Sequence, residues 1–233
     1  MNALIAELEK ELKGKEIVKQ LQYLTERFPG EITFSSSFGL EDQALTHFIA
    51  SNNLAIKIFT LDTARMFTET YSTWSRTVEK YHLAIAAFYP EAHTLQDFVT
   101  EKGPNSFYES VENRKECCHI RKVEPLNRAL KNTKVWITGV RAEQSANRQK
   151  MQLVEWDEHY QLIKYNPLLN WSLHQLEQFI SEHQIPVNTL HKKGFPSIGC
   201  APCTRAILSG EDIRAGRWWW ESSNKECGLH EGR

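Results

Sequence analysis

Residues 32–42 read ITFSSSFGLED, and this stretch decides the fold. Its first part, residues 32–36, is rich in β-branched and aromatic residues, which predicts a buried strand. Three serines and a glycine then form a short loop, and the apolar spacing over residues 42–51 predicts a helix. A strand that leads through a short loop into a helix is the first part of a βαβ unit, which builds parallel sheets.

The same alternation of strand-length apolar runs and helical segments continues beyond this stretch. We expect further strands at 55–61, 83–88 and 135–138, a strand pair at 151–156 and 160–165, and helices at 68–81, around 114–130, and from an N-cap at Ser172 to His183. The predicted fold is therefore α/β, with an open, mostly parallel sheet flanked by helices.

Regular periodicity fades from about His191 onward, where Gly, Pro, Cys, Arg and the run Trp218-Trp219-Trp220 dominate. We expect one α/β domain over residues 1–215 and a mobile C-terminal tail over residues 216–233. The three tryptophans are assigned no chemical role, because adjacent aromatic residues are at least as suited to packing the end of the chain.

The composition excludes several classes of protein. The chain has 233 residues, of which 41% are hydrophobic and 24% charged, with a formal net charge of -1. This charge gives no general attraction to nucleic acid or to an anionic membrane. Residues 1–19 lack the features of a secretory signal, and no apolar run approaches the roughly 18 residues of a membrane helix. We expect a cytoplasmic protein whose cysteines stay reduced.

The loop Ser35-Ser36-Ser37-Phe38-Gly39 is a candidate phosphate cradle. Backbone N–H groups and the start of a helix can face an anion there, and the hydroxyls add donors. The loop matches neither the GxxxxGK[ST] pattern of P-loop NTPases nor the GxGxxG pattern of dinucleotide-binding dehydrogenases, so both classes are disfavoured.

Four of the five cysteines form two pairs. Cys117 and Cys118 are adjacent in NRKECCHIRK, and Cys200 and Cys203 form a CxxC in GCAPC. Four soft thiolates in two pairs suit a tetrahedral zinc ion or an iron–sulfur cluster. The spacing alone favours neither, because an adjacent pair is not a ferredoxin spacing.

The fifth cysteine, Cys227, is the candidate nucleophile. It lies in KECGLH near the end of the chain, where Lys225 and His230 can lower the pKa of its thiol and Gly228 permits a tight turn. A thiolate on a mobile tail can meet first a substrate and then a partner protein.

Basic residues cluster in the loops beside the cysteine motifs. They are Lys122, Arg141, Arg148, Arg214 and Arg217. Arginine suits bidentate contacts with anions, so this placement predicts a site for a multiply charged anionic group.

Five sequence blocks together resemble those of one protein family, both in their residues and in their order along the chain. ECCHIRKVEPL, ITGVRAEQS, GCAPCTRAI, EDIRAGRWWWE and KECGLH are similar to the signature blocks of assimilatory adenylyl-sulfate (APS) reductases, the iron–sulfur branch of the sulfonucleotide reductases. The resemblance implies an adenine nucleotide alpha-hydrolase-like fold. It also favours a [4Fe-4S] cluster over zinc at Cys117, Cys118, Cys200 and Cys203.

The resemblance further implies a reaction and its participants. Cys227 would attack adenosine 5'-phosphosulfate to give an enzyme S-sulfocysteine, which reduced thioredoxin or glutaredoxin would resolve to sulfite, in sulfate assimilation toward cysteine. A homo-oligomer is expected. The implied substrate-binding residues are Ser35, Ser36, Ser37, Phe38, Gly39, Leu61, Lys122, Gly139, Arg148, Arg214, Arg217 and His230, with Arg121 and Arg141 less certain.

Three alternatives stay open. The chain could act on the 3'-phosphorylated nucleotide (PAPS), or on both nucleotides. It could be an ATP pyrophosphatase that adenylates a substrate, although SSSFGLED replaces that class's SGGxDS loop. It could also be a non-catalytic zinc or iron–sulfur protein with an incidental C-terminal cysteine.

Overall fold

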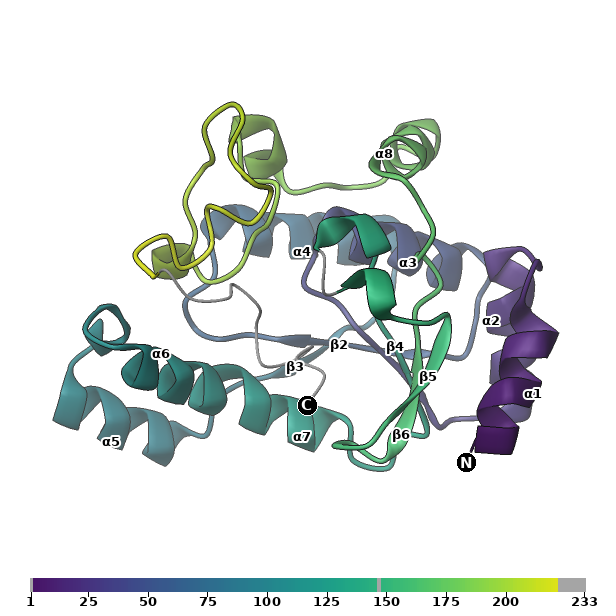
Figure 1. Cartoon of the computed structure of the whole chain (residues 1–233), viewed down its shortest axis with the longest axis horizontal. Helices are drawn as coiled ribbons and strands as arrows, with labels where there is room; N and C mark the ends of the chain where they lie inside the picture. Colours follow the sequence, from purple (N-terminus) through teal and green to yellow (C-terminus); the bar gives the residue numbers. More distant parts are fainter. Residues whose placement is uncertain (1, 146–147, 222–233) are drawn as a thin grey trace. The chain divides into compact units, whose positions relative to one another are not determined.

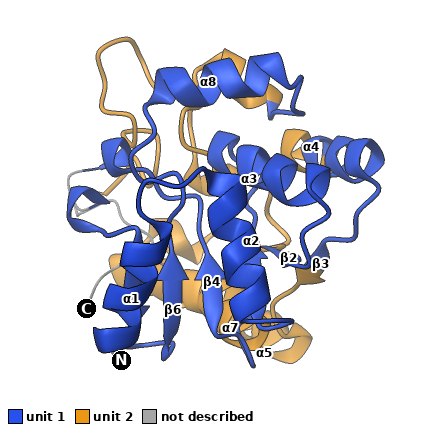
Figure 2. Cartoon of the chain, turned by 90° about the vertical axis from the view of Figure 1, so that its right-hand side faces the viewer, with its two compact units in different colours: residues 1–60, 72–86, 130–188 blue, residues 61–71, 87–129, 189–233 orange. Residues whose placement is uncertain are grey.

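The computed structural model describes residues 2–145 and 148–221 (Figure 1). The chain forms two compact units, which Figure 2 colours separately. Unit 1 comprises residues 1–60, 72–86 and 130–188. Unit 2 comprises residues 61–71, 87–129 and 189–233, as far as they are described.

The described strands form one six-stranded sheet in the order β3-β2-β1-β4-β6-β5. They are β1 (Ile32–Ser35), β2 (Lys57–Leu61), β3 (Ala86–Phe88), β4 (Val135–Ile137), β5 (Val154–Asp157) and β6 (Leu162–Tyr165). β1 pairs in parallel with β2 and with β4, and β4 pairs in parallel with β6. β5 is antiparallel to β6. The predicted α/β class, the mostly parallel sheet and the late strand pair are confirmed.

The helices flank these strands in sequence. They are α1 (Asn2–Leu12), α2 (Ile17–Arg27), α3 (Leu40–Ser51), α4 (Thr68–Tyr81), α5 (Ala92–Lys102), α6 (Val111–Cys118), α7 (Glu124–Ala129) and α8 (Leu173–Glu182). A π-helical turn, η2 (His119–Val123), joins α6 to α7, and the short 3-10 turns are η1 (Ser106–Tyr108), η3 (Ala142–Gln144), η4 (Arg148–Lys150), η5 (Thr189–Lys193) and η6 (Ala201–Cys203). Among the described residues, no helix has the length and apolarity needed to cross a bilayer.

The structure differs from the sequence-based expectation at three helices and one junction. α4 has the predicted bounds, whereas α1, α2 and α5 were not predicted. The helix expected around residues 114–130 is split by the π-helical turn η2. Pro125 lies at the second position of α7 and has no N–H to donate to the carbonyl four residues back, so a regular α-helix cannot run unbroken through this junction.

The order of the strands defines a switch point in unit 1. From β1 the chain moves to β2 on one side, and it later returns to place β4 on the other side of β1. Phe34 on β1 is paired with Ile137 on β4, so the loops that follow these two strands leave the same edge of the sheet side by side. Ligands of open parallel sheets bind at such points.

A continuous hydrophobic core holds unit 1 together. The fully buried side chains include Leu8 and Leu24 from the two N-terminal helices, Phe34 and Ile137 from the strands, and Leu176 from α8. Each such side chain contributes about 1.5–3 kcal/mol to folding by leaving water. The core therefore fixes the strands whose ends carry the loops described below.

A buried polar contact anchors the N-terminal helices to this core. The hydroxyl of Tyr165, on β6, donates a hydrogen bond to Oε1 of Gln20 on α2. The Nε2 group of Gln20 donates in turn to the carbonyls of Leu12 and Lys15, at 2.9 and 2.8 Å. Gln20 thus holds the turn between α1 and α2 against the sheet.

Replacing Tyr165 with phenylalanine is expected to lower the free energy of unfolding by about 1–3 kcal/mol, because Oε1 of Gln20 would stay buried without its donor. Urea unfolding, monitored by far-UV circular dichroism, measures this change. A loss of less than about 0.5 kcal/mol, the range of ordinary surface substitutions, would contradict the anchoring role.

Candidate functional site

The serine-rich loop of unit 1 is closed by a carboxylate from the helix that follows it. The backbone N–H of Ser37 donates to Oδ2 of Asp42 at 2.6 Å, and the Ser37 hydroxyl donates to the same oxygen at 2.7 Å. Phe38 has a left-handed backbone with φ of 61°, and its N–H donates to the Ser36 hydroxyl at 3.3 Å. The donors of Ser37 and Phe38 that we expected to face an anion are thus used within the loop.

Gly139 lies against this loop, after the end of β4. A Cβ atom at this position would lie 2.1 Å from Oδ1 of Asp42 and 3.1 Å from Cβ of Glu41. Only glycine allows such an approach. The structure therefore brings together two parts of the predicted nucleotide site, residues 35–39 and Gly139.

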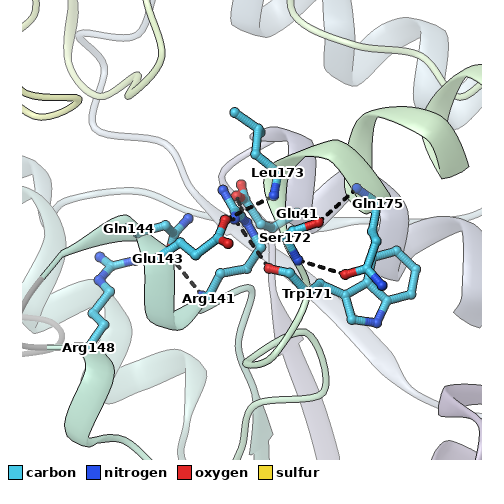
Figure 3. Close-up of polar contacts among 9 residues, drawn as sticks. All are labelled: Glu41, Arg141, Glu143, Gln144, Arg148, Trp171, Ser172, Leu173 and Gln175. Carbon is cyan, nitrogen blue, oxygen red and sulfur yellow. Dashed lines mark hydrogen bonds and ion pairs between the residues drawn. The ribbon is translucent and has the colours of Figure 1, made fainter.

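The two arginines after β4 have different surroundings, as Figure 3 shows. Arg141 is fully buried, and its guanidinium donates to Glu41 at 2.7 Å, to Glu143 at 3.0 Å and to the carbonyl of Trp171 at 3.3 Å. These contacts give Arg141 a structural role. Arg148 donates to the side-chain oxygen of Gln144 and lies close enough to Asp42 to act on its charge.

Figure 3 also shows the predicted N-cap of α8. Ser172 accepts a hydrogen bond from the backbone N–H of Gln175 at 3.1 Å, and the side chain of Gln175 accepts from the backbone N–H of Ser172 at 2.9 Å. This is a complete capping box. Glu143 accepts from the backbone N–H of Leu173 at 3.0 Å, so the start of α8 is tied to the turn that holds Arg141.

Asp42 carries a strongly shifted pKa. Burial raises the pKa of its carboxyl to about 6, and the negative charge of Glu41 adds to this rise. The hydrogen bonds from Ser37 and the positive charge of Arg148 act in the opposite direction without cancelling it. The state of this loop is therefore sensitive to mildly acidic pH.

Unit 2 contains a pocket lined by the four paired cysteines. Cys117 and Cys118 end α6, while Cys200 is the N-cap of the short turn η6 and Cys203 is its last residue. All four are free thiols. The remaining lining residues are Arg65, Phe107, Arg114, Arg121, Lys122 and Pro202. Thiols and cations thus meet in one place, as the sequence motifs led us to expect.

Local structure positions each pair of thiols. The first pair is followed directly by the π-helical turn η2, which carries Arg121 and Lys122. The second pair is folded back on itself, because the N–H of Cys203 donates to the carbonyl of Cys200 at 3.0 Å. The hydroxyl of Thr63 lies 3.3 Å from the sulfur of Cys200. The CxxC loop is therefore held by the segment that follows β2.

The thiols differ in acidity. Burial raises the pKa of Cys203 to about 12, and burial likewise raises the pKa of Cys117. Burial also acts to raise the pKa of Cys200, but Lys122, the hydrogen bond with Thr63, Arg217 and Arg121 together hold it below its ordinary value. Of Cys117, Cys200 and Cys203, Cys200 is therefore the most readily ionised.

The predicted substrate-binding residues fall in both units. Ser35, Ser36, Ser37, Phe38, Gly39, Gly139, Arg141 and Arg148 belong to unit 1, and Leu61, Arg121, Lys122, Arg214 and Arg217 belong to unit 2. The guanidinium of Arg217 lies 4.9 Å from the ring centre of Trp218, and the carbonyl of Arg214 accepts from the Arg217 N–H at 2.9 Å. Cys227 and His230 lie outside the described residues.

Four lining residues were not predicted from the sequence, and two of them, Arg65 and Arg114, are charged. Arg114 precedes Cys118 by four positions on one helix, a spacing that places both side chains on the same face, so this signal was available. Arg65 offered no comparable signal. Its guanidinium reaches the pocket while donating to the side chain of Asn105 at 2.7 Å.

A single metal ion has no ready-made site in the part of the chain that the structure describes. There, no group of three or more His, Cys, Asp or Glu side chains is arranged to hold one ion. The four thiols share a pocket but are not converged on one point.

The comparisons with known proteins agree with these features. Residues 31–206 match the family described as the phosphoadenosine phosphosulfate reductase domain. An adenosine 5'-phosphosulfate reductase of Burkholderia cepacia is 51% identical over 201 residues, covering 86% of this chain and 80% of the relative. One of Agrobacterium fabrum is 44% identical over 226 residues, covering 97% and 86%.

Solved structures give a matching result. A phosphoadenylyl-sulfate (PAPS) reductase of Candida auris, in complex with phosphate, superposes with a TM-score of 0.75 at 27% identity, covering 86% of this chain and 96% of that one. A Candida glabrata FMN adenylyltransferase reaches a TM-score of 0.55 at 17% identity, covering 98% and 86%, and is similar in fold alone.

The pKa of Asp42 predicts a pH dependence of stability. Between about pH 4 and pH 6 the folded protein holds a proton on Asp42 that the unfolded chain has released, so stability falls as the pH rises through this window. The variant Asp42→Asn has no group that titrates at this position. Between about pH 4 and pH 6, the free energy of unfolding of the wild type should therefore fall by about 2–3 kcal/mol relative to that of the variant. Urea unfolding at several pH values measures this difference, and a flat difference would contradict the assignment.

The thiol acidities predict an order of alkylation. In reduced protein treated with a chelator, iodoacetamide should modify Cys200 several-fold faster than Cys203 at pH 8, because the thiolate is the reactive form. Lys122→Met should slow the alkylation of Cys200 at least about threefold, because it removes the positive charge that lowers the pKa of this thiol most. Peptide mapping by mass spectrometry measures both rates.

The exposed lysine on α6, Lys115, provides the matched control. Lys115→Met removes the same charge from the same stretch of chain and should leave the Cys200 rate unchanged. Equal slowing by the two substitutions would show that Lys122 has no specific effect on this thiol.

Proposed function

The chain belongs to the phosphoadenosine phosphosulfate reductase domain family, and we propose that it reduces adenosine 5'-phosphosulfate to sulfite and AMP through an S-sulfocysteine at Cys227. The chain is an oxidoreductase of sulfate assimilation, the pathway that leads from sulfate toward cysteine. The observation that carries the proposal is the pocket of four free thiols among fixed cations, in a chain whose relatives are named APS reductases.

We propose that Cys117, Cys118, Cys200 and Cys203 hold a [4Fe-4S] cluster. The donor set fits, because four soft thiolates are the usual ligands of such clusters. The resemblance to the iron–sulfur APS reductases favours this cluster over a zinc ion at the same four cysteines.

The surroundings of the thiols also fit an anionic group. The buried Nε of Arg121 has no hydrogen-bond partner among the described residues, and Arg65, Arg114 and Lys122 line the same pocket. Fixed cations lower the cost of burying the negative charge of ligated thiolates. When bound, the cluster supplies electrostatic tuning beside the substrate without net electron transfer.

The first chemical step belongs to Cys227. Its thiolate attacks the sulfur of the phosphosulfate, so a sulfur–sulfur bond forms while the bond between that sulfur and the bridging phosphate oxygen breaks, and AMP departs with the bond's electron pair. This is covalent catalysis, which divides one difficult reduction into two steps. Lys122, Arg148, Arg214, Arg217 and His230 are proposed to neutralise the anionic groups.

The second step needs two thiols of a redox partner. One thiolate attacks the Cys227 sulfur and releases sulfite, leaving a mixed disulfide between the two proteins. The partner's second thiol then frees Cys227, so the partner leaves as a disulfide and has supplied both electrons. We propose thioredoxin, or glutaredoxin, as this partner. We also propose that the enzyme is a homo-oligomer and that it works in the cytoplasm.

The remaining parts of the proposal concern the chain's organisation. We propose that residues 1–215 carry the nucleotide-binding and cluster-binding functions and that residues 216–233 act as the catalytic tail. The loop of residues 35–39, with Leu61 and Gly139, is proposed to bind the nucleotide. The position of residues 35–39 and Gly139 at the switch point of the sheet supports this assignment.

A second candidate function is the reduction of PAPS, alone or together with APS. The structural similarity to the Candida auris PAPS reductase supports this second candidate. The four-cysteine pocket favours APS, because PAPS-specific enzymes of the resembled family typically lack the two cysteine pairs.

Anaerobically purified protein with reduced thioredoxin is expected to release sulfite from radiolabelled APS and not from PAPS. Cys227→Ser should abolish this release while the iron content stays unchanged, because Cys227 is a nucleophile and not a cluster ligand. Release from PAPS would establish the second candidate. Iron-free protein inactive on both nucleotides, or full activity of Cys227→Ser, would contradict the proposed reaction.

A further inference from the structure

A buried ion pair fixes the last described residue of the chain. Nε of Arg114 donates to Oε1 of Glu221 at 2.9 Å, and Nη2 donates to Oε2 at 2.9 Å. The two side chains are only 7% and 5% exposed. Two parallel hydrogen bonds between a guanidinium and a carboxylate set both position and orientation. Glu221 is therefore held tightly to α6.

Arg114 also contacts the cysteine pocket. It lines the pocket, forms a hydrogen bond with the thiol of Cys118, and lies 4.8 Å from the ring centre of Trp218. A single guanidinium thus contacts a proposed cluster ligand on α6 and Glu221, which lies within the proposed tail of residues 216–233. A change in the position of Cys118 therefore acts on the group that holds Glu221.

The location of Glu221 gives this pair a functional consequence. Cys227 follows Glu221 by six positions, so the nucleophile can lie at most about 20 Å from the fixed carboxylate. Restricting the volume that a reactive group explores raises its effective concentration at the substrate. Breaking a buried ion pair leaves an uncompensated charge in the interior, which is energetically costly. The restraint that Arg114 imposes on Glu221 therefore opens rarely.

We propose that Arg114 and Glu221 are positioning residues that form a latch between the cysteine pocket and the catalytic tail. The latch rests on the proposed role of Cys227. It makes the placement of the nucleophile depend on the position of Cys118, so that the tail is restrained when the four cysteines of the pocket are in place to bind the cluster. Neither residue is assigned a contact with the substrate.

A second Arg–Glu pair in unit 2 provides a matched control. Arg128 donates to Glu124 through Nε at 2.7 Å and Nη2 at 3.0 Å, with the same forked geometry. These side chains are 37% and 34% exposed, and neither lines the cysteine pocket. Glu124→Gln therefore removes a partly exposed pair of the same forked geometry without touching the latch, and Arg128 keeps its ion pair with Glu91 at 3.5 Å.

The test compares Glu221→Gln, Glu221→Asp and Glu124→Gln in the iron-loaded enzyme. Glu221→Gln should lower the single-turnover rate of S-sulfocysteine formation at saturating APS by at least about tenfold, while KM for APS changes by less than about threefold. Trypsin cleavage after Lys225, a readout independent of activity, should become at least about threefold faster. Glu221→Asp should recover part of both effects, and Glu124→Gln should match the wild type.

Two results would overturn the latch. One is a Glu221→Gln enzyme whose single-turnover and cleavage rates lie within twofold of the wild type. The other is loss of iron in Glu221→Gln in parallel with activity, which would make the pair a structural support of the pocket. A wild-type enzyme that forms no S-sulfocysteine from APS would instead overturn the proposed function itself.

Discussion

Holding four ionisable thiols together in a partly buried pocket is the constraint on which unit 2 depends. Buried thiolates are unfavourable unless cations lie beside them, and the chain supplies those cations from the same elements that carry the cysteines. Arg114 lies on α6 and Arg121 with Lys122 on η2, directly around Cys117 and Cys118. The π-helical turn therefore contributes two of the four cations that line the pocket.

Unit 1 also contains a buried ionisable group, and there hydrogen bonds stabilise it as well as a positive charge. Asp42 is buried beneath the loop whose shape it determines, and its oxygen atoms are met by Ser37 on one side and by the bare backbone of Gly139 on the other. The carboxylate therefore couples the end of β1 to the end of β4. The pKa of about 6 is the cost of that arrangement, since hydrogen bonds and the charge of Arg148 offset burial only in part.

The sequence predicted features that depend on local pattern. The bounds of α4, the capping box at Ser172, the parallel sheet and the late strand pair all follow from short-range periodicity and turn chemistry. Cysteine spacing, together with resemblance to a family, was enough to expect the two pairs in one pocket.

Two of the long-range contacts were not predicted. Arg114 and Glu221 are 107 positions apart in the sequence, and nothing in either local segment indicates their pairing. The closure of the serine loop by Asp42 was missed because an acidic residue in the first turn of a helix is ordinary, and only the fold shows where its oxygens point.

The most direct test of the central claim is the mass of the peptide that contains Cys227 after incubation with APS in the absence of a reductant. The expected result is one added SO3 group on Cys227, with an equal amount of AMP, both dependent on APS and reversed to sulfite by a dithiol. An unmodified Cys227 in a preparation that still releases sulfite from APS when thiol is present would contradict it.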